Sequence, residues 1–560
     1  MRQNKQEYLL SWIFCICYLG IWIFLFWRCR YGFALEDETF YLTIPYRICM
    51  GDRFLIDEWH VSQMSAVFLL PLMKLYLSIM HSTEGIVLCF RYFFTVIWGI
   101  SGIILWRKLN GFSLLGAMAA SSCFALYAPW GIMALSYQSL SMLLLMISCL
   151  VLITDKRPVW MVCAGVLYAG SVLCSPYLVL LYPLSILSLL VTERSGRKEL
   201  FRRWLFFSVG IFLSAAGLCL ALLSAGCFSD YMKVFPMILN DPSHPLELNP
   251  AERVLFMIYH AQNINSYFKI CVGVALSIII AAKISGFHKI GLILLVIDII
   301  FFLFSFQTGY NLLNFLMFPA CFVGLYCFLC EDDFVIRKLF WGLWIPGFIY
   351  SFCHFYASNQ NFWAYSHASA IMTIASLVIV VRYAGICCSE SKDQISRISV
   401  NLAVGMLILC QLSCEMITRY QQVLWNEKIE DQTVLAEEGP EKGILINEDI
   451  SEYYKLIEED LWVLNEDSSI QKVLIVAQHP WLYLGMNKEY STFTTWLEPM
   501  NKQSMERLNT YYEMFPDKIP DAVLFDRDYE NLIPQFEKKG YLISDDVMSE
   551  YSRMMRRKIE

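Results

Sequence analysis

Charge is what this chain has least of. Only 17% of its 560 residues are Asp, Glu, Lys or Arg, whereas ordinary soluble domains carry about 25%. Hydrophobic residues make up 57%, and the mean hydropathy is +0.49. These values exclude an ordinary soluble domain and indicate an integral membrane protein. The net charge of −7 shows no basic excess, so a nucleic acid is not an expected partner.

Sequence signals for disulfides, zinc and nucleotides are also missing. The 20 cysteines are scattered through apolar runs without metal-ligand spacing, and none follows Trp425. A disulfide scaffold and a zinc site are therefore poor interpretations, and cysteine is expected to act as a small buried apolar residue. No glycine-rich phosphate loop follows an expected strand, which argues against a nucleotide site. No internal repeat is evident.

Long apolar runs dominate the first three quarters of the chain. Runs of roughly 17 to 22 residues recur about thirteen times before residue 418. The first, Tyr8–Trp27, has no small-residue cleavage pattern and predicts a retained helix rather than a signal peptide. Basic residues gather in alternate loops, above all in Arg194–Arg203, which predicts a cytoplasmic amino terminus. The two long loops, about 28–85 and 227–267, then lie outside the cell.

The chain divides near residue 424 into two unlike parts. Residues 1–424 are expected to form the transmembrane domain, and residues 425–560 are polar. In the polar part, β-rich runs alternate with helical patterns, which favours a small α/β domain with parallel strand pairing. The runs expected as strands are 443–447, 472–478 and 521–526, and the expected helices are 450–464, 504–515 and 529–539. An odd number of spans places this domain outside, so the fold class is a multi-pass α-helical membrane protein with an extracytoplasmic α/β domain.

The most informative polar cluster is Glu36-Asp37-Glu38, directly after the first span. Acidic residues at a helix start can simply favour the helix dipole and cap free N–H groups. A second polar cluster, Asp57-Glu58-Trp59-His60, follows in the same loop. One helix start does not need both clusters, which favours a chemical role for these residues over helix capping alone.

The first loop resembles the GT-C membrane glycosyltransferases. The residues that carry this resemblance are the Asp37-Glu38 pair after the first span, aromatics after the pair, Gly51, and then a polar-aromatic stretch. The family includes protein O-mannosyltransferases and aminoarabinose transferases, and many of its bacterial members are uncharacterised. In the tail, the stretches Gln478–Leu484 and Ser491–Trp496 also resemble soluble domains of such enzymes. Glu36 and the 57–60 run are not general features of the family, so their roles stay open.

The resemblance implies an inverting glycosyltransferase in the plasma membrane. Its donor would be a polyprenyl-phosphate sugar, and its acceptor a hydroxyl of a glycan, a glycolipid or a protein on the outer face. Asp37 would be the catalytic base, with Glu38 orienting it or binding substrate. A cation would stabilise the departing phosphate, and Arg47, Arg53, Lys74 and Arg91 are the candidates by position. No metal or other cofactor is required, although a divalent metal is possible.

Further residues are candidates for contact with the donor or the acceptor. In the second long loop, Lys233 and His244 could contact donor or acceptor. The favoured interpretation of this loop is a surface lid with ordinary turn chemistry, in which neither residue has that role. Polar residues at outer span ends either anchor helices or line a sugar-binding cavity. Such residues occur at Tyr137-Gln138, 307–311 and 359–361. His354 and His367 are expected to be core or interfacial residues. The substrate-binding candidates are Glu36, Arg53, Asp57, Glu58, His60, Gln63, Lys74, Arg91, Tyr137, Gln138, Lys233 and His244.

Two other function classes compete with the transferase. A polytopic transporter or flippase for envelope lipids or glycans would place ionisable residues inside the spans and often repeat its halves. The apolar runs carry few charges, Arg91 being an exception. A non-catalytic scaffold for envelope assembly is the second rival. The sugar, the prenyl chain and the acceptor are not encoded in any recognisable motif.

Overall fold

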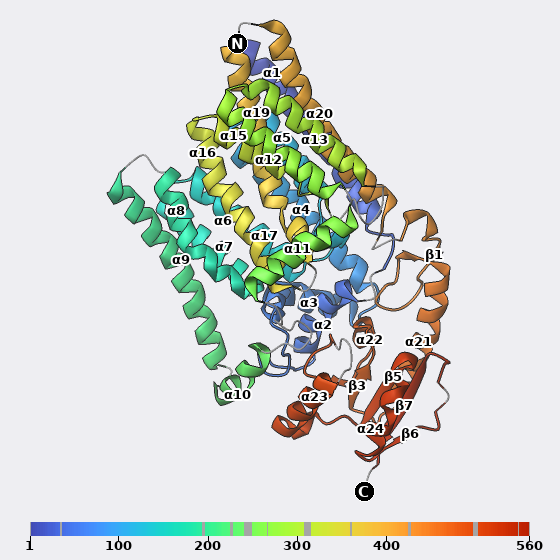
Figure 1. The fold of residues 1–560 in the computed structure, drawn as a ribbon. Coiled ribbons are helices and arrows are strands. Elements are labelled where there is room, and N and C mark those ends of the chain that lie inside the picture. Colours follow the sequence, from blue (N-terminus) through green and yellow to red (C-terminus); the bar gives the residue numbers. More distant parts are fainter. Residues whose placement is uncertain are drawn as a thin grey trace.

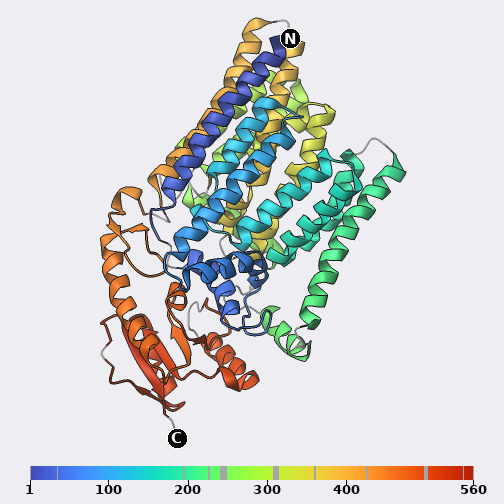
Figure 2. The same ribbon diagram turned by 180° about the vertical axis from the view of Figure 1, so that it is seen from behind.

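A bundle of apolar helices with a small α/β domain at one end makes up the molecule (Figure 1). This computed structural model describes residues 2–33, 36–192, 196–224, 228–239, 249–265, 267–306, 315–358, 361–391, 393–423, 427–496, 502–546 and 548–558. The start of α1 lies at the end of the bundle opposite to the C-terminal domain in both views (Figures 1 and 2).

The apolar runs fold as helices because a bilayer offers no hydrogen-bond partner to exposed backbone, so each segment must satisfy its own N–H and C=O groups. Among the described residues, nine helices are long and apolar enough to cross a membrane. The expectation of a multi-pass helical membrane protein is confirmed, whereas a count of thirteen spans is not. The bundle contains α1 (Arg2–Arg28), α4 (Ile86–Leu109), α5 (Leu114–Leu126), α6 (Tyr137–Thr154), α7 (Pro158–Cys174), α8 (Tyr182–Thr192), α9 (Arg197–Ser224), α12 (Phe268–Ser285), α13 (His288–Ser305), α15 (Cys321–Cys330), α16 (Phe334–Leu339), α17 (Ile345–Ala357), α18 (Asn361–Ala368), α19 (Ala370–Glu390) and α20 (Gln394–Gln421).

Small residues let neighbouring helices of the bundle approach closely. Helices α7 and α9 meet at Gly165 and Gly210, where a side-chain carbon at Gly165 would lie only 2.0 Å from the carbonyl oxygen of Phe207. Because lipid tails are as apolar as leucine, such close packing rather than hydrophobic burial holds membrane helices together.

Several shorter elements lie at the end of the bundle that adjoins the C-terminal domain (Figures 1 and 2). Among them, the segment Gln63–Met80 is one of the nine helices that meet the length and hydropathy of a span, although the sequence places it within the outer loop 28–85. The position of that loop relative to the membrane therefore stays a prediction. These elements are α2 (Asp37–Cys49), the 3-10 turn η1 (Gln63–Ser65), α3 (Ala66–Met80), α10 (Phe228–Leu239) and α11 (Pro250–Ile264).

The C-terminal domain is built on a five-stranded mixed sheet with the order β4-β3-β5-β7-β6. Strand β3 pairs in parallel with β4 and β5, whereas β7 runs antiparallel to β5 and β6. The strands are β3 (Lys472–Val476), β4 (Glu489–Tyr490), β5 (Ala522–Asp526), β6 (Tyr541–Ile543) and β7 (Ser552–Arg557), and the helices are α21 (Glu448–Glu466), α22 (Trp481–Leu484), α23 (Lys502–Met514) and α24 (Ile533–Glu537). A separate hairpin joins β1 (Val434–Leu435) to β2 (Leu445–Ile446).

The sequence predicts this domain in part. The runs at 472–478 and 521–526 form β3 and β5, and their parallel pairing is as expected. The run at 443–447 contributes only two residues to the small hairpin, outside the main sheet. Strand β7 was not expected, because Ser-Arg-Met-Met-Arg-Arg has none of the β-branched or aromatic residues that mark strands.

The C-terminal domain shares a hydrophobic core with the long loops. Ile56 and Trp59 of the first loop and Val234 of α10 are buried together with Leu474 of β3 and Val523 of β5. Backbone hydrogen bonds also join the end of α1 to the hairpin, from Gly32 N–H to the carbonyl of Leu445 at 2.8 Å. The domain is therefore packed against the end of the bundle by residues far apart in the sequence.

Candidate active site

A cavity of about 130 Å³ lies where the first loop, the helical bundle and the C-terminal domain meet. Its walls combine acidic, imidazole, amide and aromatic side chains, a mixture that suits a polar ligand with apolar faces. The lining residues are Asp37, Phe40, Tyr41, His60, Tyr127, Pro129, Trp130, Tyr137, Gln138, Met142, Tyr350, His354, Ser358, Ala364, His367, Ala368 and Trp496.

Asp37 is the only carboxylate among the described lining residues. It is the first residue of α2, and Glu36 precedes it as the N-cap residue without a side-chain capping bond. The Tyr41 side chain lies one turn further along the same helix and also lines the cavity. Burial and the nearby Asp37 carboxylate raise the pKa of Tyr41 well above its usual range, so this phenol is a proton-bearing neighbour of the carboxylate.

Glu38 has a different environment from Asp37. Arg91 of α4 donates two hydrogen bonds of 2.6 Å to the Glu38 carboxylate, and both side chains are buried. Arg91 also donates to the carbonyls of Cys29 and Gly32, at 2.8 and 2.7 Å. Because successive helical residues project about 100° apart, Asp37 can line the cavity while Glu38 ties α2 to the bundle. Arg91, expected as a phosphate-binding candidate, is therefore held in an ion pair outside the cavity lining.

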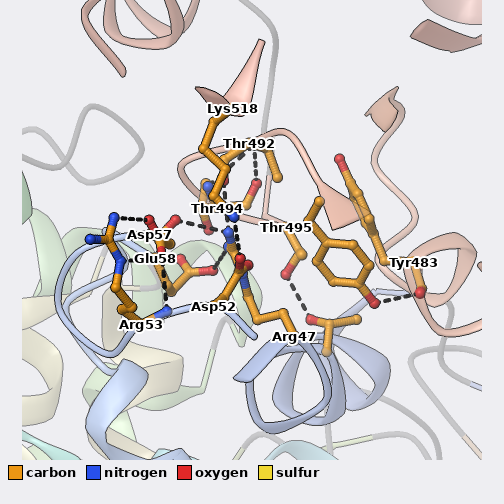
Figure 3. A network of polar contacts seen from close by, with 12 residues as sticks. Arg47, Asp52, Arg53, Asp57, Glu58, Tyr483, Thr492, Thr494, Thr495 and Lys518 are labelled. Carbon is orange, nitrogen blue, oxygen red and sulfur yellow. Dashed lines mark hydrogen bonds and ion pairs between the residues drawn. The ribbon is translucent and has the colours of Figure 1, made fainter. Parts of the chain in front are cut away.

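A second buried network joins the first loop to the C-terminal domain (Figure 3). Arg47 of α2 donates hydrogen bonds of 2.6 Å to both Asp52 and Glu58. It also donates to the carbonyl of Thr492 at 2.9 Å, and Lys518 reaches Asp52 at 2.5 Å. Burial lowers the pKa of Arg47, but the two carboxylates more than offset this and raise it well above its usual value. The network thus keeps Arg47 charged and attaches α2 to the C-terminal domain.

Most charged candidates from the first loop belong to this structural network. Asp57 accepts from the backbone N–H and the guanidinium of Arg53, at 2.7 and 3.0 Å. Burial raises the pKa of Asp57, but these hydrogen bonds outweigh it and hold the pKa below its usual value. Gln63 is fully buried and donates to the carbonyl of Glu58 at 2.6 Å. The structure brings Arg53, Asp57, Glu58 and Gln63 together, but outside the cavity lining.

Three other candidates do line the cavity. The backbone N–H of Ser62 donates to Nδ1 of His60 at 3.2 Å, which favours the tautomer with its proton on Nε2. Gln138 Nε2 donates to the hydroxyl of Tyr137 at 3.0 Å. The Tyr137 ring in turn lies edge-on to Tyr41, with 5.9 Å between ring centroids. The first loop and the start of α6 therefore form one wall together.

The remaining candidates lie elsewhere. Lys74 on α3 is exposed and is not part of the lining. Lys233 on α10 is exposed and lies 3.7 Å from Asp230. His244 lies outside the described residues, as do the polar segments 307–311 and 359–360.

Sequence reasoning missed several lining residues in the bundle. His354 of α17 and His367 of α18 were expected to be core or interfacial residues, and the structure places both in the cavity wall. His354 lies 3.1 Å from the Tyr177 hydroxyl, and His367 packs on Trp130 with 4.3 Å between ring centroids. Trp130 has a φ of +57°, a strained conformation for a bulky residue. Two histidines on either side of one helix connection were the available signal.

The described lining contains no lysine or arginine. The Arg253 guanidinium of α11 donates a hydrogen bond to the carbonyl of Ser358, which does line the cavity. Within the described part of the chain, no three His, Cys, Asp or Glu side chains are placed to hold a metal ion together. That the protein requires no metal ion therefore stays a prediction.

No family model and no curated protein matches the chain. Among solved structures, the crystal structure of ArnT from Cupriavidus metallidurans bound to undecaprenyl phosphate is similar, with a TM-score of 0.46. The two chains are 10% identical, and the match covers 98% of this chain and 97% of the other. At this level of similarity, no residue role transfers from that structure.

Proposed function

We propose that this protein transfers a sugar from a polyprenyl-phosphate donor to an acceptor hydroxyl, with Asp37 as the general base. The observation that carries the proposal is the position of Asp37, the only carboxylate in the described lining of a cavity between a helical bundle and a polar domain. Asp37 and Glu38 also match the pair on which the resemblance to GT-C glycosyltransferases rests.

The reaction requires one proton transfer and one displacement at carbon. Asp37 accepts the proton of the acceptor hydroxyl, and the oxygen attacks the anomeric carbon of the donor. The bond between that carbon and the phosphate oxygen breaks, and the electron pair leaves with the polyprenyl phosphate. Attack from the face opposite the leaving group inverts the anomeric configuration. An aspartate carboxylate is ordinarily ionised at neutral pH and can act in this way from hydrogen-bond distance.

Among the described residues, we assign the stabilisation of the departing phosphate to Arg253. It is hydrogen-bonded to the backbone of a lining residue, whereas Arg47, Arg53 and Arg91 are each engaged by buried carboxylates. A guanidinium near a developing phosphate charge stabilises the transition state and matches the oxygens of the phosphate with a planar set of donors. The proposal therefore gives Arg253 the role for which position in the sequence favoured Arg47, Arg53, Lys74 and Arg91.

The setting of the reaction follows from the expected topology. We place the cavity and the C-terminal domain on the outer face of the plasma membrane, with the amino terminus in the cytoplasm. The start of α1 and the C-terminal domain lie at opposite ends of the bundle, which supports their placement on opposite sides of the membrane (Figures 1 and 2). The donor lipid would then reach the cavity from the outer leaflet.

Reconstitution of the full-length protein in liposomes tests the proposal. A panel of polyprenyl-phosphate sugars serves as donor. Alkyl glycosides and peptides that contain serine or threonine (hydroxyl peptides) serve as acceptors. We expect equal amounts of free polyprenyl phosphate and glycosylated acceptor. A flippase would instead move the donor between leaflets without consuming it, and that result would refute the transferase.

A further inference from the structure

The C-terminal domain contributes an aromatic side chain to the cavity. Trp496 lines the cavity together with Asp37, and no other described residue after 427 does so. Its ring lies edge-on to Phe40, with 5.2 Å between ring centroids. Phe40 follows Asp37 by three residues, so it lies on the same side of α2 and one turn away. The indole of Trp496 therefore contacts the ring of Phe40, and Phe40 in turn is the neighbour of Asp37 on α2.

Three of the four residues that precede Trp496 bind the first loop. The backbone N–H of Trp59 donates to the carbonyl of Phe493 at 2.7 Å. The hydroxyls of Thr43 and Thr495 lie 2.7 Å apart, and the Arg47 guanidinium holds the carbonyl of Thr492 (Figure 3). A segment held at three of its four residues leaves the side chain that follows it little freedom.

We infer that Trp496 binds the acceptor and that this acceptor is a carbohydrate. The flat apolar face of an indole packs well on the C–H face of a sugar ring, and the ring hydroxyls then point sideways to polar partners. His60 and Gln138 lie in the same lining and supply such partners. A serine or threonine side chain of a protein acceptor has no comparable face to cover the indole.

The position of Trp496 assigns it to the acceptor rather than to the donor. The donor sugar is attached to a lipid and has to approach from the bundle, whose helices contribute Tyr350, His354 and His367 to the lining. Trp496 comes instead from the polar domain, in the stretch that follows β4. This inference rests on the proposed transferase function and narrows its acceptor class to glycans and glycolipids.

Kinetics of full-length variants in liposomes test the inference. Donor concentration and alkyl glycoside concentration are varied separately for the wild type, Trp496→Ala and Trp496→Phe. Trp462→Ala is the matched control, because Trp462 lies on α21 of the same domain and is 65% exposed. We expect Trp496→Ala to raise the acceptor KM roughly tenfold or more, while the donor KM and kcat stay within about threefold. Trp496→Phe should recover most of the loss, and the control should match the wild type.

Several outcomes would overturn the inference. An unchanged acceptor KM in Trp496→Ala, a rise in the donor KM alone, or transfer to hydroxyl peptides but not to glycosides would each do so. If Trp496→Ala does not accumulate in membranes, Trp496→Leu carries the test, since leucine keeps an apolar contact with Phe40 but has no flat ring face for a sugar. An unchanged acceptor KM in Trp496→Leu would then overturn the inference.

A binding measurement separates this inference from the proposed reaction. Saturation-transfer NMR with methyl glycosides, without any donor, should detect sugar binding to the wild type and its loss in Trp496→Ala. A wild type that binds glycosides through Trp496 but transfers no sugar would refute the transferase and leave the binding site. A wild type that transfers sugar with no role for Trp496 would refute only the inference.

Discussion

Adjacent carboxylates on α2 have different tasks. Asp37 lines the cavity, and Glu38 forms a buried ion pair with Arg91 of α4. Removing one partner of such a pair is costly, because it leaves the other charge buried without compensation. At the scale of single residues, Glu38 is therefore expected to determine whether α2 stays in place rather than to act on substrate.

Glu38→Gln should destabilise the folded protein by about 3–5 kcal/mol, because Arg91 loses its counter-charge. Thermal unfolding of the purified protein in detergent would show this as a lower Tm. Glu36→Gln is the control, since Glu36 is only half-buried at the N-cap position. Equal melting temperatures for the two variants would contradict the structural role of Glu38.

A carboxyl pair in the C-terminal domain makes stability depend on pH. Glu441 is 1% exposed, and its Oε2 has no hydrogen-bond partner among the described residues. Burial and the charge of Glu458 raise the pKa of Glu441 to about 8. Burial and nearby carboxylates, Glu438 first, raise the pKa of Glu458 to about 7. Both groups bind protons more tightly in the folded than in the unfolded chain, so folding is favoured at low pH.

The contribution of this pair is fully present below the unfolded-state pKa of about 4.3. It is lost as the pH rises to about 8. The wild-type Tm is therefore expected to fall between pH 5 and pH 8, and Glu441→Gln should remove roughly half of that fall, because Glu458 keeps its own raised pKa. Exposed Glu437 provides the control substitution, Glu437→Gln. A Tm profile for Glu441→Gln that keeps the wild-type slope would contradict the assignment.

At the scale of elements, α2 is attached to its surroundings near both of its own ends. Arg91 attaches its first turn to α4, and Arg47 attaches its last turn to the C-terminal domain through Thr492. The position of Asp37 in the cavity therefore depends on contacts made by other residues of the same helix. A rigid mounting of this kind is what a general base needs to keep hydrogen-bond distance.

Arg47→Lys should loosen the attachment of α2 to the C-terminal domain. A lysine ammonium cannot reproduce the planar fork that contacts two carboxylates and two carbonyls at once. Hydrogen exchange should become faster in 37–49 and in 491–496, and the Tm should fall. Arg527→Lys serves as the control, because the Arg527 side chain is 63% exposed and lies outside this network. Unchanged exchange in both segments would show that Arg47 does not fix this junction.

At the scale of the whole molecule, the sequence predicts the parts better than their assembly. Hydropathy and local periodicity are sufficient to predict the helical bundle, strands β3 and β5, and an acidic cluster after the first span. The partner of Glu38 lies 53 residues away, and the partner of Arg47 in the C-terminal domain, Thr492, lies 445 residues away. No local pattern encodes such contacts. Arg53, Asp57 and Glu58 were expected to bind substrate, whereas the structure places them in ion pairs within the first loop and outside the cavity lining.

Only part of the cavity wall could be predicted from the sequence. Asp37, His60, Tyr137 and Gln138 were expected at the site and do line one cavity. His354, His367 and Trp496 come from segments whose composition is typical of core or of a soluble domain. Only the packing of the bundle, the first loop and the C-terminal domain brings them together.

Sugar transfer by the full-length Asp37→Asn variant tests the central claim most directly. Asparagine keeps the size of the side chain but cannot accept the hydroxyl proton, so kcat should fall roughly 10²- to 10⁴-fold. Membrane abundance, Tm and donor binding should match the wild type, and Glu36→Gln should retain nearly full activity. An Asp37→Asn protein that transfers sugar at a rate close to that of the wild type would contradict the claim that Asp37 is the base.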